Sequence, residues 1–138
     1  MRRFAVLLAL ATVVSCGGDS STSPSASVSG SYSLQSVNAQ PLPWLAAQNG
    51  ADKWEVVSDV ITLDDSGAFA ESTINRYTKN GLVTSDTVND SGTYTLGGTV
   101  ITFFGSDNYT ESGVLGGGTL TIRATGIVGP VAALFKKQ

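Results

Sequence analysis

The fold is decided by the stretch Thr119-Leu120-Thr121-Ile122-Arg123-Ala124, in which polar and apolar residues alternate. Because successive side chains of a β-strand point to opposite faces, the three apolar residues share one face. The segment Gly92-Thr93-Tyr94-Thr95-Leu96 alternates in the same way, and no window after residue 50 has the 3.6-residue period of a helix. The sequence therefore predicts an all-β domain.

Short clusters of Gly, Asn and Asp separate the β-prone segments from residue 64 onward. Asn80-Gly81 is the sharpest of these signals, because a two-residue type I′ turn needs positive φ at both positions. We expect eight strands, at 30–38, 53–63, 67–78, 82–96, 99–104, 108–115, 119–125 and 131–137. Short connections favour an antiparallel up-and-down meander, and closure into a barrel would remove both exposed edges. A two-sheet sandwich is the alternative.

The stretch 39–52 interrupts this pattern. Pro41-Leu42-Pro43 is extended, and residues 44–49 allow one or two helical turns, ended by Gly50, that would lie across one mouth of the barrel. The strand that follows carries apolar residues on both faces. A β-bulge, or partial cover of its outer face by residues 41–50, would explain this.

The composition excludes several kinds of site. The chain has 138 residues, one Cys and no His, so we expect one domain with no internal disulfide and no zinc finger. His is the commonest general base and the commonest metal ligand. We therefore expect no catalytic residue, no metal and no cofactor, and a protein that is not an enzyme.

The N-terminus is typical of an exported protein. Two Arg residues precede an apolar run from Phe4 to Val14, which is too short to span a bilayer as a helix. The run ends in Val13-Val14-Ser15-Cys16, which resembles a bacterial lipobox. The resemblance implies that residues 1–15 are removed as a signal peptide and that Cys16 is acylated. The alternative is that Cys16 is an ordinary small apolar residue of the signal peptide.

Residues 16–29 are expected to be the anchor Cys and a flexible linker rich in Ser and Gly, followed by a domain at 30–138. Gly17 after the Cys resembles outer-membrane sorting, which implies a domain that faces the periplasm or the cell surface. Without residues 1–15 the net charge is −5, and an acidic surface disfavours nucleic acid. We expect contact with the membrane through the lipid on Cys16; the oligomeric state is not predicted.

Several short motifs of the domain resemble the lipocalin-like domains of small bacterial lipoproteins. The motifs are Gly30-Ser31-Tyr32-Ser33-Leu34, Val37-Asn38, Pro41-Leu42-Pro43, Leu63-Asp64-Asp65-Ser66-Gly67-Ala68-Phe69 and Ser91-Gly92-Thr93-Tyr94-Thr95-Leu96. The resemblance implies an eight-stranded barrel. It also implies the best-known role of that family, which is to hold a ligand.

Two groups of acidic and amide side chains are candidates for chemistry. Asp64 and Asp65 would face opposite ways on a strand, and in Asp-Asp-Ser-Gly they are typical turn formers. Asp86, Asn89 and Asp90 offer oxygens to calcium, but they lack the spacing of a known calcium loop. We interpret them as solvated groups at the end of a strand.

Aromatic residues are the candidates for ligand contacts. The candidate ligand-lining residues are Tyr32, Trp44, Trp54, Phe69, Tyr94 and Phe103. The alternative is that these side chains fill the interior, because an eight-stranded barrel is only just wide enough for its own side chains.

The sequence leaves two functions open. The first is a lipid-anchored binding module of the cell envelope that holds a small apolar ligand in its barrel. The second is an envelope interaction or scaffold protein, or an inhibitor of a secreted enzyme, that has a filled barrel and acts through its outer face or loops.

Overall fold

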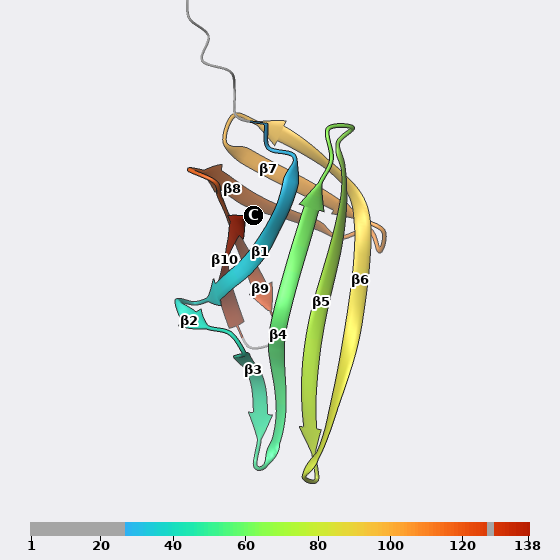
Figure 1. Ribbon diagram of the computed structural model, residues 1–138, viewed down its shortest axis with the longest axis vertical. Coiled ribbons are helices and arrows are strands. Elements are labelled where there is room, and N and C mark those ends of the chain that lie inside the picture. Colours follow the sequence, from blue (N-terminus) through green and yellow to red (C-terminus); the bar gives the residue numbers. More distant parts are fainter. Residues whose placement is uncertain (1–26, 127–128) are drawn as a thin grey trace, which may run out of the picture.

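The computed structural model describes residues 27–126 and 129–138 (Figure 1). The expected signal peptide, the anchor Cys16 and most of the expected linker lie outside the described residues. The strands are β1 (Gly30–Val37), β2 (Gln40–Pro41), β3 (Trp44–Asn49), β4 (Asp52–Leu63), β5 (Ala68–Lys79), β6 (Leu82–Gly97), β7 (Val100–Gly105), β8 (Thr110–Gly116), β9 (Thr119–Gly126) and β10 (Gly129–Lys137). The prediction of an all-β domain is confirmed. The described residues include no helix that could cross a membrane.

Strands β1 and β4 to β10 form a closed eight-stranded antiparallel barrel. From β4 to β10, strands that follow one another in sequence pair with each other. β1 closes the barrel, because it pairs with β10 on one side and with residues 60–63 of β4 on the other. Closure confirms the predicted meander barrel and excludes the sandwich. All eight predicted strands are present, and their ends agree with the prediction to within two residues.

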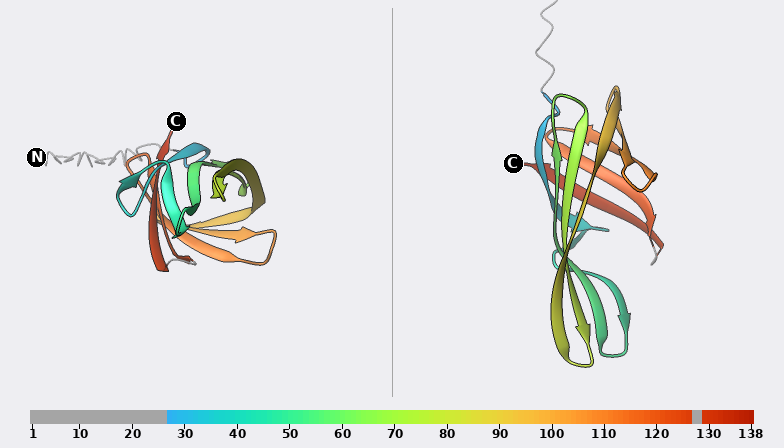
Figure 2. Two further views of the ribbon diagram at one scale, coloured as in Figure 1. Left: turned by 90° about the horizontal axis from the view of Figure 1, so that it is seen from below. Right: turned by 90° about the vertical axis from the view of Figure 1, so that its right-hand side faces the viewer.

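The barrel closes only over its upper part in Figure 1. Strands β4 to β6 continue below it, where β3 joins them to make a four-stranded sheet (Figures 1 and 2). We call this sheet the extension. It exists because β1 pairs only with residues 60–63 of β4, while β3 pairs with residues 52–56. On the other side, β7 pairs with β6 only from Gly92 onward.

The prediction of helical turns at residues 44–49 is wrong. These residues form strand β3, which pairs with β4 and runs along the extension instead of crossing a mouth of the barrel. A helix of six residues is marginal, whereas a strand beside β4 gains backbone hydrogen bonds along its length. Gly50, with φ 61°, belongs to the tight turn between the two strands. The bulge predicted for the following strand is present, because the register of β4 against β5 shifts between Val56 and Ser58.

The apolar core fills the upper part of the barrel. Its buried residues are Tyr32, Leu34, Val37, Ile61, Leu63, Phe69, Tyr94, Ile101, Phe103, Leu120, Ile122 and Phe135. Phe69 and Phe103 pack edge to face, with ring centroids 5.1 Å apart. The Phe69 ring lies over Gly92, where an added Cβ would come within 2.9 Å of its Cε1 atom. The interior at this level is therefore occupied by side chains.

The turn between β5 and β6 gives the first testable prediction. Asn80 and Gly81 have φ values of 50° and 81°, as the predicted type I′ turn requires. A Cβ at Gly81 would meet no atom within 4 Å, so substitution should cost only backbone strain. We expect Gly81→Val to lower the free energy of unfolding by about 1–2 kcal/mol in urea denaturation.

Gly97→Val is the matched control. A Cβ at Gly97 also meets open space, but its backbone is not in the left-handed region. We expect a change below about 0.5 kcal/mol for this variant. Equal losses in the two variants would contradict the assignment of strain to Gly81.

Candidate functional site

An open crevice lies where strands β8 and β9 separate. The two strands pair from Gly113 opposite Ile122 to Gly116 opposite Thr119, and the pairing does not extend to residues 110–112 and 123–126. Each of those segments still pairs with its other neighbour, β7 or β10. The space between them has a volume of about 570 Å³. Its lining residues are Glu71, Tyr109, Thr110, Glu111, Ser112, Arg123, Ala124 and Thr125.

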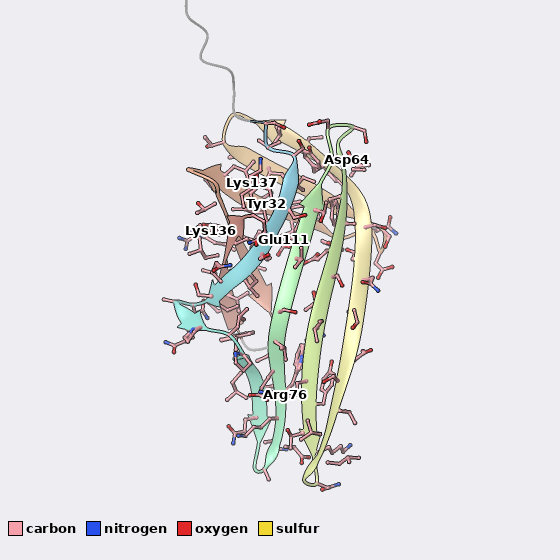
Figure 3. All side chains as sticks on the ribbon, viewed as in Figure 1. Tyr32, Asp64, Arg76, Glu111, Lys136 and Lys137 are labelled. Atoms are coloured by element: carbon pink, nitrogen blue, oxygen red, sulfur yellow. The ribbon has the colours of Figure 1, made fainter. Side chains whose placement is uncertain are left out.

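Four acidic residues face the interior at the level of this crevice. Glu111 lies opposite the core residue Phe103, and Glu71 lies between Ile61 and Asp90 in the sheet. Asp59 is two residues from Ile61 on β4, so the strand alternation places it on the same inner face. In the view of Figure 3, Glu111 lies below Tyr32. The acidic cluster is therefore Asp59, Glu71, Asp90 and Glu111, from four different strands.

Asp59 and Glu71 form a carboxyl pair that holds a proton near neutral pH. Burial raises the pKa of Asp59 to about 6. Burial and the charge of Asp59 raise the pKa of Glu71 to about 8. Glu71 donates the hydrogen bond between them, because it keeps its proton to the higher pH.

The other members of the cluster differ in protonation. Burial, and then the charge of Glu71, raises the pKa of Glu111. Burial acts to raise the pKa of Asp90, but hydrogen bonds from Tyr109 and from Ser106 Oγ, the latter at 2.9 Å, outweigh it and lower that pKa. Burial and the hydrogen bond to Asp90 raise the pKa of Tyr109. The crevice thus combines a fixed carboxylate with carboxyls whose charge changes near neutral pH.

The structure separates the six aromatic residues predicted to line a ligand site. Four of them, Tyr32, Phe69, Tyr94 and Phe103, are at most 9% exposed and belong to the core. Trp44 is half-buried and packs against the core from the start of β3. Trp54 lies in the extension, where it stacks on Tyr77 and donates from Nε1 to Oδ1 of the buried Asn75 at 2.9 Å. Trp54 thus lies outside the set that the barrel brings together, and Trp44 contacts that set from its edge.

The predicted roles of the acids are confirmed in part. Oδ1 of Asp64 accepts hydrogen bonds from the backbone N–H groups of Ser66 at 2.8 Å and Ala68 at 2.9 Å, so Asp64 is a turn former. Asp86 and Asn89 are exposed, as predicted, but they lie within β6 and not at its end. The prediction for Asp90 is wrong, because this residue is half-buried inside the barrel in the middle of β6 and not at a solvated strand end.

Sequence reasoning missed the acidic cluster. The sequence did contain a signal. Asp90 and Tyr94 are four residues apart on one strand, and Glu71 and Phe69 are two residues apart on another, so each acid shares a face with an aromatic residue. Among the described residues, no three Asp or Glu side chains are arranged to hold a metal ion. No protein-family model matches the sequence, and no curated protein matches it. The chemistry of the crevice is therefore the basis for inferring a function.

The carboxyl pair predicts that the domain loses stability as the pH rises from 5 to 9. The folded-state pKa values of about 6 and about 8 lie above the ordinary values of 3.8 and 4.5. The folded state therefore holds more protons than the unfolded state in this range, and the free energy of unfolding falls with pH. This stabilisation is complete below about pH 4 and is lost through the folded-state values. The chain has no His, so few other groups titrate in this range. Melting temperatures at pH 5, 7 and 9 would measure the effect.

Glu71→Gln keeps the shape of the side chain and removes the charge that is buried at high pH. We expect it to raise the free energy of unfolding at pH 9 by on the order of 2–3 kcal/mol and to flatten the pH dependence. Asp65→Asn makes the same change of charge in an exposed turn and should keep the wild-type dependence. A wild-type slope in Glu71→Gln would show that this pair does not control stability.

Proposed function

We propose that the protein is a lipid-anchored binding module of the cell envelope, with a lipocalin-like barrel whose ligand carries a positive charge. The observation that supports this is the crevice between β8 and β9, which opens onto Glu71 and Glu111. Carboxylates that lose their hydration on burial are stabilised by a cation that hydrogen-bonds to them. A small organic amine fits this requirement, and the volume of the crevice lies in the range of small-molecule sites.

The distribution of charge supports a cationic ligand. Among the described residues, the ion pair that the structure contains joins Arg76 Nε to Glu55 Oε2 at 2.9 Å. It lies in the extension, away from the crevice (Figure 3). Arg123 lines the crevice, but its side chain is exposed at the rim. Among the described residues, the acidic cluster therefore has no basic partner at its centre, and an ammonium group from a ligand would supply one.

The position of the core also favours a ligand at the polar end. Buried side chains such as Phe69 and Phe103 occupy the upper interior, so we place the ligand in the crevice instead of the apolar core. Tyr109 and Ala124 give the crevice some less polar wall. An amine attached to a short apolar group therefore suits it better than a fatty acid, whose carboxylate the acidic cluster would repel.

The anchor belongs to the same proposal, on the basis of the lipobox-like sequence that ends at Cys16. The described chain begins beside the hairpin between β8 and β9, since Ser27 and Val28 line a pocket with residues 116–119. The crevice lies at the opposite ends of the same two strands. The proposed anchor would therefore attach at the end of the barrel that is remote from the crevice.

A second candidate function is an interaction or scaffold protein. The feature that favours it is the unpaired edge of β6 in the extension, because strand edges recruit other strands.

The proposed ligand chemistry can be tested with dansylcadaverine, a fluorescent primary amine, titrated into the protein at pH 8.5. We expect saturable binding with a blue shift of the dansyl emission, and an affinity that rises between pH 6 and pH 8 as Asp59 and Glu71 ionise. Glu111→Gln should weaken binding by about tenfold or more, because it removes a charge-assisted hydrogen bond.

Two controls separate this site from general attraction to an acidic protein. Asp65→Asn, which makes the same change of net charge in an exposed turn, should leave the affinity unchanged. Dansylamide, which has no ammonium group, should bind much more weakly. Equal binding of the amine by wild type and Glu111→Gln would contradict the proposed site.

The anchor is tested separately by metabolic labelling with a fatty acid. We expect label in the wild-type chain and none in Cys16→Ser, because Cys16 is the single thiol of the chain. The variant should be found uncleaved or released from the membrane. Unchanged labelling of Cys16→Ser would refute the anchor while leaving the ligand proposal untouched.

A further inference from the structure

Residues 82–91 of β6 form a long strand edge that has no partner strand among the described residues. β5 pairs with one side of them in an unbroken register, and β7 joins the other side only at Gly92. Every residue from Leu82 to Asn89 is exposed. Leu82, Val83 and Val88 are 70%, 57% and 49% exposed. β6 is the right-hand border of the extension in Figure 1.

This edge lacks several of the features that usually keep strands from pairing with other chains. Residues 82–91 contain no Pro and no Lys, and their pairing with β5 has no bulge; their charged residues are Asp86 and Asp90. The opposite edge of the extension is β3, which has six residues and a register shift between Leu45 and Ala47. A shifted, short edge is a poor template for a further strand. The β6 edge is therefore the better site for association.

The free edge presents the backbone groups of odd-numbered residues. Asn80-Gly81 is a two-residue turn, so the flanking residues Lys79 and Leu82 form a hydrogen-bonded pair. Hydrogen-bonded pairs recur at every second residue, so the even-numbered residues of β6 donate to and accept from β5. On the β7 side, Ser106 N donates to Ser91 O at 3.0 Å, as this alternation requires. The unused N–H and C=O groups therefore belong to Val83, Ser85, Thr87 and Asn89.

We propose that a second copy of this chain pairs with this edge, antiparallel about a two-fold axis at Ser85. Odd-numbered residues then face odd-numbered residues, so that Ser85 meets the partner's Ser85 and Val83 meets the partner's Thr87, with about six backbone hydrogen bonds. Leu82 meets the partner's Val88 on the inner face, which pairs the exposed apolar side chains twice. Asp86 meets the partner's Thr84, so that no like charges are directly opposed.

The length of the free edge favours this register over its neighbours. With the axis at Ser85, the partner's Asn80 lies opposite Asp90, two residues before β7 begins to pair at Gly92. Moving the axis to Asp86 would place the partner's turn against Gly92, where β7 already pairs, and would oppose the two Asp86 carboxylates. Moving it to Thr84 would leave Val88 opposite the partner's turn. The two extensions would merge into one eight-stranded sheet with a barrel at each end.

The register is tested by disulfide cross-linking of the full chain under mild oxidation. We expect Ser85→Cys to form a covalent dimer, because directly opposed residues of an antiparallel pair have Cα atoms about 5.5 Å apart, within disulfide reach. Thr87→Cys alone should not cross-link, since the axis places the two copies of this residue four positions apart. The double variant Val83→Cys, Thr87→Cys should cross-link again. The wild-type chain, whose single thiol is Cys16, shows how much cross-linking Cys16 contributes.

A second measurement asks whether the association occurs without a cross-link. Wild type in mild detergent should sediment as a concentration-dependent dimer. Ser85→Pro should remain monomeric with an unchanged β-sheet circular dichroism spectrum, because it removes an N–H that faces the free edge and not one that pairs with β5. Ser85→Ala should behave as wild type. A monomeric wild type with no cross-link in Ser85→Cys, or a dimer that survives Ser85→Pro, would overturn the proposal. None of these results depends on the ligand of the crevice.

Discussion

The structure depends on how β4 divides one of its sides between two strands. Residues 60–63 pair with β1 and so close the barrel, while residues 52–56 pair with β3. The barrel wall therefore ends where β1 leaves β4, although β4, β5 and β6 continue for many residues. β6 is too long to lie in the barrel wall over its whole length, because β7 is shorter and pairs with only the last part of it. The extension, whose two edges have no partner strand in the described part of the chain, follows from this mismatch in strand length.

Closure also creates an interior with an apolar part and an acidic part. The apolar residues lie where all eight strands surround the interior, and the acidic cluster lies where the wall begins to open. A complete wall at that level would bury Asp59, Glu71 and Glu111 away from water, which is costly for ionised carboxyls. The separation of β8 from β9 gives them access to solvent or to a ligand. The crevice and the acidic cluster thus depend on each other.

Local patterns were sufficient for the parts of the fold that short segments determine. The eight barrel strands, the turn at Asn80-Gly81 and the turn role of Asp64 each depend on a few adjacent residues. Residues 44–49 were misassigned because their strand exists only through pairing with β4. The acidic cluster was missed for a related reason: alternation puts Glu71 and Asp90 on inner faces, but their meeting depends on register and closure across four strands.

The proposed anchor and the proposed dimer constrain each other through the position of the N-terminus. Lys137 Nζ donates to Ser27 O at 2.6 Å at the upper end of the barrel, whereas the turn at Asn80-Gly81 lies at the lower tip of the extension (Figure 1). Antiparallel pairing about Ser85 therefore places the two N-termini at opposite ends of the merged sheet. An upright dimer would keep one acylated end out of the membrane, at the cost of exposing its acyl chains to water. Together the proposals imply a merged sheet that lies along a single membrane surface.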